Sequence, residues 1–297
     1  MTPVLRCGTF ELALDRPRVM GILNVTADSF SDGGRFLPRD RAIAHGLALA
    51  ADGADLVDVG GESTRPGAEP VPVEIELARV MPVVRALVRE GVAVSVDTMK
   101  PEVMRQALDA GCAMVNDVNA FRAGGAIAAV APYGAGLCAM HMLGTPATMQ
   151  ADPRYDDVVR EVRDYLLARA RALQEAGVAR SRIAIDPGFG FGKSHGHNAA
   201  LLAGLREIAA AGYPVVAGLS RKRMIGEITG RPVEGRMAGS VAAALVAVQN
   251  GALIVRVHDV RETVDALKVL HALTPGPSPA SGRGERKSPS PSGRGSG

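Results

Sequence analysis

Residues 54–97 read ADLVDVGGESTRPGAEPVPVEIELARVMPVVRALVREGVAVSVD, and this stretch decides the fold class. It holds two apolar runs, at 54–61 and 92–97, and between them a segment at 74–91 whose apolar residues recur every three or four positions. The short runs are typical of buried strands, and the longer spacing is typical of a helix. Gly91 stands where a helix usually ends. The stretch therefore predicts a strand–helix–strand unit with parallel strands.

The same unit recurs along the chain. The apolar runs are VMGILNV (19–25), ADLVDVGG (54–61), VAVSVD (92–97), AMVND (113–117), GLCAMH (136–141), IAID (183–186), PVVAGLS (214–220) and LIVRVH (253–258). Further segments with helical spacing lie at 41–53, 101–111, 156–177 and 239–251. Continuous apolar strands indicate a sheet that is covered on both faces. Eight units in roughly 250 residues match the size of a (β/α)8 TIM barrel, so we predict that α/β fold.

A doubly wound sheet is the competing architecture. It usually has fewer strands and often a Gly-rich first turn, and no G-x-G-x-x-G follows the first run here. The segment LRCGTFELAL (5–14) precedes the first run and predicts a short β-hairpin that closes the barrel floor.

The C-terminal segment 275–297, PGPSPASGRGERKSPSPSGRGSG, contains one Ala and no larger aliphatic residue. Such a composition cannot bury apolar surface, so we predict a barrel domain over 1–274 and a disordered tail over 275–297. A phosphate- or RNA-binding tail is one alternative, and a passive extension is favoured over it.

The charge of the predicted domain excludes an obvious polyanion partner. The chain has 34 Lys and Arg against 31 Asp and Glu. Four of the basic residues and one acidic residue lie in the tail, which leaves 30 of each in 1–274. Nucleic-acid binding needs concentrated positive charge, so we expect no nucleic-acid partner.

The cysteines and the hydropathy pattern indicate the compartment. Cys7, Cys112 and Cys138 are odd in number and form no C-x-x-C pair, which argues against a disulfide framework or a Cys zinc site. No run of 18 apolar residues and no signal-peptide profile occur. The expectation is a cytoplasmic protein that has no membrane segment.

Polar residues stand at the ends of the predicted strands, where a barrel of this kind carries its active site. They are Asn24, Asp58, Asp97, Asn116, Asp117, His141, Asp186, Ser220, Arg221, Lys222, Arg256 and His258. Any one of them has an even chance of merely capping a turn. A polar residue at nearly every strand end predicts a shared pocket.

Asp97, Asn116 and Asp186 are the acceptor-bearing members of this set. A carboxylate accepts two parallel N–H bonds, which suits a planar amidine-like edge such as that of a 2-amino-pyrimidinone. Lys222 can donate to a ring oxygen or nitrogen. The set therefore predicts a heterocycle receptor, and its spacing does not match a His and carboxylate metal cage.

Other residues favour an anion. Arg256 and His258 are two apart on one strand, so they face the same side. Asn24 precedes the loop TADSFSDGGRF (26–36), which predicts a place for Mg²⁺ on a phosphate. A second loop at 60–71 carries Thr64, and both loops have the Gly content of mobile lids. The alternative for residues 63–66 is a plain helix-entry turn.

Eight motifs in series together resemble bacterial dihydropteroate synthases. They are GILNVTADSFSDGG (21–34), VDVGGESTRPGA (57–68), SVDTMKPEV (95–103), VNDV (115–118), MHMLGTPATMQ (140–150), DPGFGFGK (186–193), SRKRMIG (220–226) and RVHDVRETV (256–264). The resemblance spans about 20–270. It implies a homodimeric (β/α)8 barrel of folate biosynthesis. Such an enzyme joins 4-aminobenzoate to (7,8-dihydropterin-6-yl)methyl diphosphate and releases 7,8-dihydropteroate and diphosphate.

The resemblance also implies a role for each matched residue. The pterin is held by Asp97, Asn116, Asp186 and Lys222. Mg²⁺ is bound by Asn24, and the diphosphate by Arg256 and His258. The aminobenzoate is framed by Phe30, Thr64, Pro66, Phe191 and Ser220, with Asp32 and Arg65 on the closing loops. Lys222, Asp97, Arg256 and His258 are expected to be the catalytic residues. Ala27, where the family often has Pro, is a small departure.

Two rival functions stay open at this point. A methyltetrahydrofolate-type methyltransferase also holds a pterin in a barrel but needs no diphosphate subsite, and the DSFSDGG loop, the SRK motif and the R-x-H pair argue against it. A non-catalytic pterin-binding homologue would have degraded loops, and both loops have their motifs here.

Overall fold

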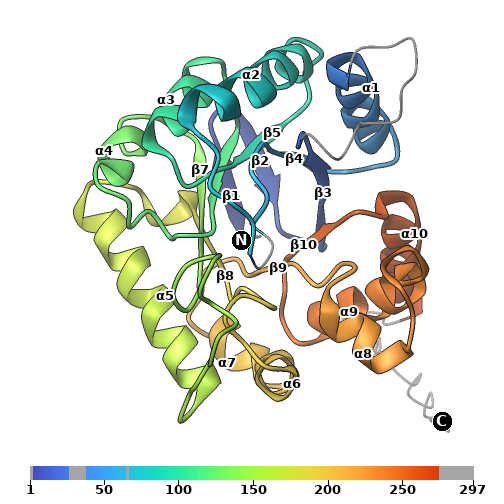
Figure 1. The fold of residues 1–297 in the computed structure, drawn as a ribbon. Coiled ribbons are helices and arrows are strands. Elements are labelled where there is room, and N and C mark those ends of the chain that lie inside the picture. The colour runs from blue at the N-terminus through green and yellow to red at the C-terminus, as the bar shows by residue number, and fades with distance from the viewer. Residues whose placement is uncertain (1–2, 27–37, 65–66, 274–297) are drawn as a thin grey trace, which may run out of the picture.

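The computed structural model describes residues 3–26, 38–64 and 67–273, and within them the chain forms a (β/α)8 barrel (Figure 1). The barrel strands are β3 (Arg18–Asn24), β4 (Leu56–Gly60), β5 (Val94–Asp97), β6 (Met114–Asp117), β7 (Gly136–Met140), β8 (Ile183–Asp186), β9 (Val216–Ala217) and β10 (Ile254–Val257). They form one parallel sheet in the order β8-β7-β6-β5-β4-β3-β10-β9. The predicted fold class is confirmed.

Helices surround this ring, as the predicted alternation requires. They are α1 (Pro38–Ala51), α2 (Val73–Arg89), α3 (Pro101–Asp109), α4 (Ala126–Val130), α5 (Val158–Glu175), α6 (His195–Ala203), α7 (Leu205–Ala209), α8 (Arg223–Thr229), α9 (Met237–Gln249) and α10 (Val260–Leu273), with 3₁₀ turns η2 (Arg180–Arg182) and η3 (Val233–Gly235). Five Gly residues predicted to end helices all have a positive φ, which a residue without Cβ adopts at little cost. They are Gly53, Gly91, Gly111, Gly177 and Gly251.

The ring closes between β8 and β9, the two ends of this strand order, over a short distance. A parallel bridge joins Ile185 to Val215, and the amide of Ile185 donates to the carbonyl of Pro214 over 2.9 Å. The strand predicted at 214–220 is reduced to the two residues of β9. The reason is that residues 218–222 leave the sheet for a turn at the mouth of the barrel, in which Arg221 adopts a φ of 56°.

The hairpin predicted at 5–14 forms as β1 (Val4–Cys7) and β2 (Phe10–Ala13), paired in antiparallel fashion. Leu5, Cys7 and Leu12 are buried against residues near the amino ends of the barrel strands, among them Met114 and Ile254. The hairpin therefore fills the floor of the barrel, as the sequence predicted. This leaves the carboxyl ends of the strands as the open end.

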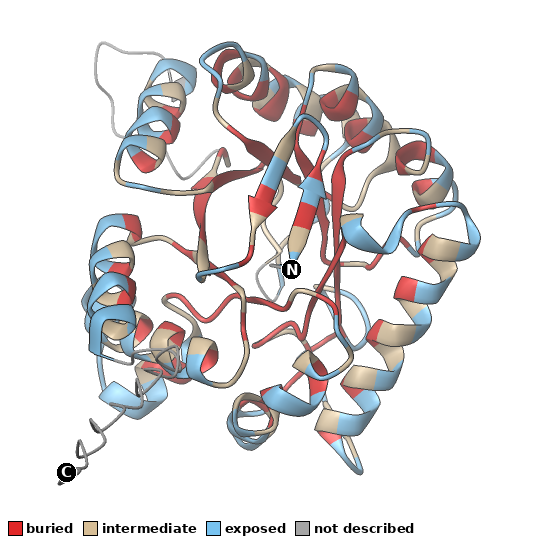
Figure 2. Cartoon of the chain, turned by 180° about the vertical axis from the view of Figure 1, so that it is seen from behind, coloured by how far each residue is buried: buried red, intermediate tan, exposed pale blue. Residues whose placement is uncertain are grey.

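Burial follows the expected layers (Figure 2). The barrel strands are buried along most of their length, and the helices bury the face that packs on the sheet. Val, Leu and Ile from both layers form one continuous core. Within the described ranges, no helix is both long and apolar enough to cross a membrane.

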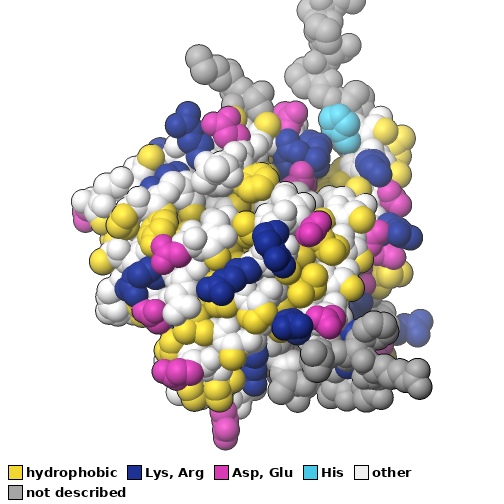
Figure 3. All heavy atoms as spheres, turned by 90° about the horizontal axis from the view of Figure 1, so that it is seen from above, with side chains coloured by type: hydrophobic (Ala, Val, Ile, Leu, Met, Phe, Trp, Pro, Cys, Tyr) yellow, Lys and Arg dark blue, Asp and Glu magenta, His cyan; other side chains and the backbone are white. Residues whose placement is uncertain are grey.

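The surface carries charges of both signs. On the face drawn in Figure 3, Lys and Arg side chains lie among Asp and Glu side chains and apolar atoms. This mixture agrees with the equal numbers of acidic and basic residues in 1–274. The absence of a nucleic-acid partner stays a prediction.

Candidate active site

One cavity at the carboxyl ends of the strands gathers seven of the ten predicted site residues that the structure describes. Its predicted members are Thr64, Asp97, Asn116, Asp186, Phe191, Lys222 and Arg256, and Val118, Met140 and Gly218 complete its wall. These residues come from β5, β6, β7, β8 and β10 and from the loops after β4, β6, β8 and β9. Their meeting at one point follows from the parallel strands, whose carboxyl ends share one edge.

Arg256 is the electrostatic centre of the cavity. Its Nε donates to Asp58 Oδ2 over 2.6 Å, and its Nη2 donates to Asp97 Oδ2 over 2.7 Å. These carboxylates hold the pKa of Arg256 above its ordinary value in spite of burial. Asn116 Nδ2 donates to the same Asp58 oxygen over 3.0 Å. Four of the strands, β4, β5, β6 and β10, are thus joined beneath the cavity by one bonded set of side chains.

Burial sets the protonation of Asp97. Loss of solvent raises its pKa to about 7, Arg256 opposes this rise, and Asp58 adds to it. One Asp97 oxygen is engaged by Arg256, so its other oxygen is the one left for a ligand. A carboxyl group that is half protonated near neutral pH can accept or donate a hydrogen bond there.

Asp186 and Lys222 form the opposite side of the cavity. Asp186 Oδ1 accepts from the amide of Gly188 over 2.7 Å. A Cβ built at Gly218 would lie 3.9 Å from Asp186 Oδ2 and 3.8 Å from Lys222 Nζ, so both groups approach one open point. Burial raises the pKa of Asp186 and lowers the pKa of Lys222 to about 8. A ligand with a donor and an acceptor on one edge could donate a hydrogen bond to Asp186 and accept one from Lys222.

An apolar wall faces these charges. Phe191 packs in a small cluster with Val118, Met140, Met142 and Met149. The Nζ atom of Lys222 lies 4.7 Å from the centre of the Phe191 ring, within the range of a cation–π contact. Met140 lies in this cluster and on the cavity wall at once.

Ser220 and His258 lie next to each other outside the cavity lining. Ser220 Oγ lies 3.0 Å from His258 Nδ1 and also accepts from the backbone amide of His258 over 3.2 Å. Asn24 ends β3 and is partly buried. Among the described residues no group of three or more His, Cys, Asp or Glu is placed to hold a metal ion. Phe30, Asp32, Arg65 and Pro66 lie outside the described residues.

Two of the predicted strand-end residues, Asp58 and His141, receive no role of their own in the site from the sequence. Asp58 is fully buried, and its Oδ1 has no hydrogen-bond partner within the described parts of the chain. Its signal was a charge in the middle of the apolar run LVDVG. His141, expected to face the pocket, lies behind it on a buried Lys193, with Nδ1 and Nζ 2.9 Å apart.

A cluster of charges supports the loop that carries Thr64. Lys100, three residues after Asp97, forms ion pairs with Glu62 and with the fully buried Glu76 on α2. Glu62 is two residues before Thr64. The cluster therefore ties the start of this loop to the strand that carries Asp97.

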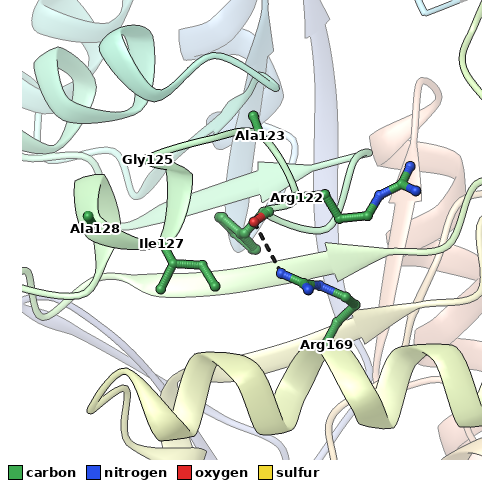
Figure 4. A pocket seen from close by; sticks show the side chains of 7 residues that line it. Arg122, Ala123, Gly125, Ile127, Ala128 and Arg169 are labelled. Atoms are coloured by element: carbon green, nitrogen blue, oxygen red, sulfur yellow. Dashed lines mark hydrogen bonds between the residues drawn. The ribbon is translucent and has the colours of Figure 1, made fainter.

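A second hollow, beside α4, lacks converging chemistry (Figure 4). Arg169 donates to the carbonyls of Ala120 and Phe121, and Arg122 extends away from Ile127. Its two cations thus point in different directions, and its other wall residues are apolar or Gly. The cavity at the strand ends is therefore the candidate active site.

Comparisons with known proteins show the family of the chain. A family described as "Pterin binding enzyme" matches residues 20–258. The fold and the site thus define the class of the chain, a pterin-binding barrel enzyme. Escherichia coli dihydropteroate synthase is 48% identical over 263 residues, which cover 88% of this chain and 93% of the relative.

Two solved structures of Xanthomonas albilineans dihydropteroate synthase are also similar. The one with 4-aminobenzoic acid has a TM-score of 0.87 and 56% identity, and it covers 92% of this chain and 98% of that one. The one in complex with 7,8-dihydropteroate has a TM-score of 0.84 and 54% identity, over 91% and 98% of the two chains. The chain belongs to the dihydropteroate synthase family, and it is a transferase of folate biosynthesis.

Proposed function

We propose that the cavity joins 4-aminobenzoate to (7,8-dihydropterin-6-yl)methyl diphosphate, giving 7,8-dihydropteroate and diphosphate. The observation that carries this proposal is the meeting of Asp97, Asn116, Asp186, Lys222 and Arg256 in one cavity. Membership of the family and the solved relatives that are named with 4-aminobenzoic acid and with 7,8-dihydropteroate support it.

The pterin edge has donors and acceptors that match these residues. Asp186 Oδ2 and the second oxygen of Asp97 accept ring and amino N–H groups, and Asn116 supplies a mixed donor and acceptor. Lys222 donates to the ring oxygen or nitrogen. Because these groups are buried, leaving any one of them without a hydrogen bond would cost binding free energy. The result is a heterocycle held in one orientation.

Departure of diphosphate needs positive charge nearby. Arg256 Nη1 and His258 are the proposed donors to the leaving group, since the other two guanidinium nitrogens of Arg256 donate to Asp58 and Asp97. Asn24 is the proposed protein ligand of Mg²⁺, an ion that prefers oxygen and is often held by few protein groups beside a phosphate. When bound, Mg²⁺ supplies neutralisation of the phosphate charge.

The amine step requires positioning and no strong base. An aryl amine is neutral at pH 7, and the methylene cation of an electron-rich pterin is stabilised by delocalisation and by Asp97 and Asp186. C–O cleavage therefore runs ahead of attack. Thr64, Phe191 and Ser220, with Phe30, Pro66, Asp32 and Arg65, are the proposed frame of the aminobenzoate.

The deciding experiment is incubation of the protein with the pterin diphosphate, 4-aminobenzoate and Mg²⁺ while diphosphate release is followed. We expect one diphosphate and one dihydropteroate per turnover. Release at the same rate without the amine would indicate hydrolysis and contradict the proposal. A methyltransferase of the rival kind would release no diphosphate at all.

Asp186→Asn tests the pterin assignment directly. The substitution turns one acceptor into a donor and removes a charge beside Lys222, so the affinity for the pterin diphosphate should fall about tenfold or more. Calorimetric titration of both proteins measures it. Unchanged affinity would remove Asp186 from the pterin site.

A homodimer is the proposed assembly. Helix α9 contains no charged residue, and Met237 and Val246 on it are exposed, as are Ile228 on α8 and Val233 in η3. Exposed apolar side chains gathered on adjacent elements favour association with a second copy. Light scattering of Ile228→Asp beside the unsubstituted protein tests this, and a monomeric parent protein would refute it. A cytoplasmic location stays a prediction.

A further inference from the structure

The loop between β8 and α6 is held by one side chain of its own, that of Lys193, and by side chains of neighbouring segments. Each carbonyl from Gly188 to Lys193 accepts a hydrogen bond from a side chain. The donors, in order of the carbonyls, are Lys193 Nζ, Lys222 Nζ, Gln150 Nε2, Lys193 Nζ, Tyr155 Oη and Asn198 Nδ2. Since a loop has no ladder of its own, these bonds determine its shape.

Lys193 is the innermost of these donors. Its side chain is 3% exposed, and its Nζ lies 2.9 Å from the Gly188 carbonyl, 3.0 Å from the Phe191 carbonyl and 2.9 Å from His141 Nδ1. An ammonium group has three N–H donors, and three acceptors surround it here. Burial and the nearby Lys222 lower the pKa of Lys193 well below its ordinary value, and the three acceptors compensate the amine for the water it has lost.

His141 completes the contact from the neighbouring strand. Burial and the nearby Lys193 lower the pKa of His141 to about 3, so its ring is neutral and Nδ1 can accept. Its backbone amide donates to the Asp186 carbonyl over 2.9 Å. A Cβ on Gly188, which has a φ of 68°, would lie 1.9 Å from the His141 carbonyl oxygen. The two loops are therefore in direct contact at this point.

This contact lies directly behind two groups of the cavity. Phe191, whose carbonyl Lys193 binds, places its ring on the cavity wall and under Lys222 Nζ. Phe189, between Gly188 and Phe191, accepts from Lys222 at its carbonyl. Movement of residues 188–191 would therefore displace both the ring and the ammonium group.

We propose that Lys193 and His141 are positioning residues: their buried cross-link between the β7 and β8 loops fixes Phe191 and Lys222 for the second substrate. The inference rests on the proposed function, in which Phe191 frames the aminobenzoate. Lys222 also donates to the pterin, but Asp97 and Asn116 hold the pterin from strands β5 and β6, away from this loop, whereas the aminobenzoate depends on the Phe191 ring. Pterin binding should therefore depend on the cross-link less than amine binding does.

The test is steady-state kinetics of Lys193→Met. This variant keeps the length of the side chain and removes its donors. We expect KM for 4-aminobenzoate to rise about tenfold or more, because small misplacements of a binding wall are costly, and KM for the pterin diphosphate to change less than about threefold. Equal changes in both constants, or a loss of thermal stability with neither constant changed, would overturn the proposal.

A pair of substitutions at His141 gives a second test in case Lys193→Met does not fold. His141→Asn can present an amide oxygen near the place of Nδ1, and His141→Leu cannot. KM for 4-aminobenzoate should stay near the parent value in the first and rise in the second. The same KM in both variants would contradict the cross-link.

Gln150→Leu is the matched control, because Gln150 binds a carbonyl of the same loop from an exposed position. We expect its KM values to match those of the parent protein. Failure of the inference is distinguishable from failure of the proposed function. If the parent protein makes dihydropteroate and Lys193→Met keeps its KM for the amine, only the inference falls, whereas a parent protein without synthesis refutes the function.

Discussion

The two ends of the barrel differ although the same strands build both. Met114 on β6, Ala184 on β8 and Ile254 on β10 are buried in the floor beneath the hairpin. Two residues further along each strand, on the same side, stand Asn116, Asp186 and Arg256 in the cavity. Residues i and i+2 of a strand face the same side and are about 7 Å apart. The interior of the barrel therefore changes from an apolar floor to a polar site within this distance.

The apolar floor contributes to stability, and the polar cavity carries the proposed chemistry. The floor gains from burial of apolar side chains, and each of them can be replaced only at a cost in packing. The cavity holds Asp58, Asp97 and Asp186 with few compensating bonds, and Arg256 neutralises only part of their charge. Substitutions at the two ends should therefore affect different measurements.

The largest effect is expected at the cavity with Lys222→Ala. Loss of the ammonium group removes a donor to the pterin and a charge beside Asp186, so turnover should fall about a hundredfold to a thousandfold. Steady-state kinetics measures this, and circular dichroism should show the fold of the parent. A variant that retains most of its turnover would break the assignment of chemistry to this end.

Leu5→Ala tests the floor. The side chain is fully buried between the hairpin and the strands, so its truncation should lower the free energy of unfolding by about 2–3 kcal/mol. Urea denaturation measures the loss. Both KM values should remain those of the parent at a temperature where the variant is folded, and a change in either one would show that the two ends are coupled.

Asp97→Asn sharpens the comparison through pH. The pKa of Asp97 is raised by burial from 3.8 to about 7, so in this interval the folded protein keeps a proton that the unfolded chain has lost. The contribution of Asp97 to stability is full below pH 3.8, falls as the pH rises, by at most about 1.4 kcal/mol per unit, and levels above about pH 7.

Because the variant lacks this titration, its free energy of unfolding relative to the parent should increase from pH 4 to pH 7 and then stay constant. Denaturation at four pH values measures the difference. A flat difference would mean that Asp97 is ionised in the folded protein throughout. A site substitution that stabilises the protein while it lowers synthesis would be the opposite of the outcome at the floor.

The smallest effect is expected from truncation after Thr274. The removed segment has no apolar side chains other than those of Pro and one Ala, and it carries a net charge of +3. We expect kcat and KM for both substrates to stay within experimental error of the full chain. A change in KM for the diphosphate substrate would favour the phosphate-binding alternative for this segment.

The architecture was accessible from the sequence because each unit repeats the same signal. Apolar runs such as 54–61 and helices that end at residues such as Gly91 predict parallel units, and eight of them predict the barrel. The strand ends then identify Asp97, Asn116, Asp186, Lys222 and Arg256, since a closed barrel can bring them together at only one end.

The contacts behind the cavity were not accessible in this way. Lys193 follows a Gly-rich loop, and nothing in its local sequence indicates that its ammonium group reaches His141, 52 positions away. The bonds of Asp58 to Arg256, 198 positions away, depend on the closure of the ring. Strand β9 is short because residues 218–222 form a turn, and the apolar run at 214–220 gives no indication of that turn.

The position of the joint between β8 and β9 predicts that substrate binding also stabilises the sheet. The bridge from Ile185 to Val215 joins β8 to the segment that enters β9, and Asp186 and Lys222 stand on the two sides of this joint. A pterin that forms hydrogen bonds with both residues would hold β8 and β9 together at the place where an isolated bridge joins them. Hydrogen exchange at the Ile185 amide would then slow in proportion to pterin occupancy.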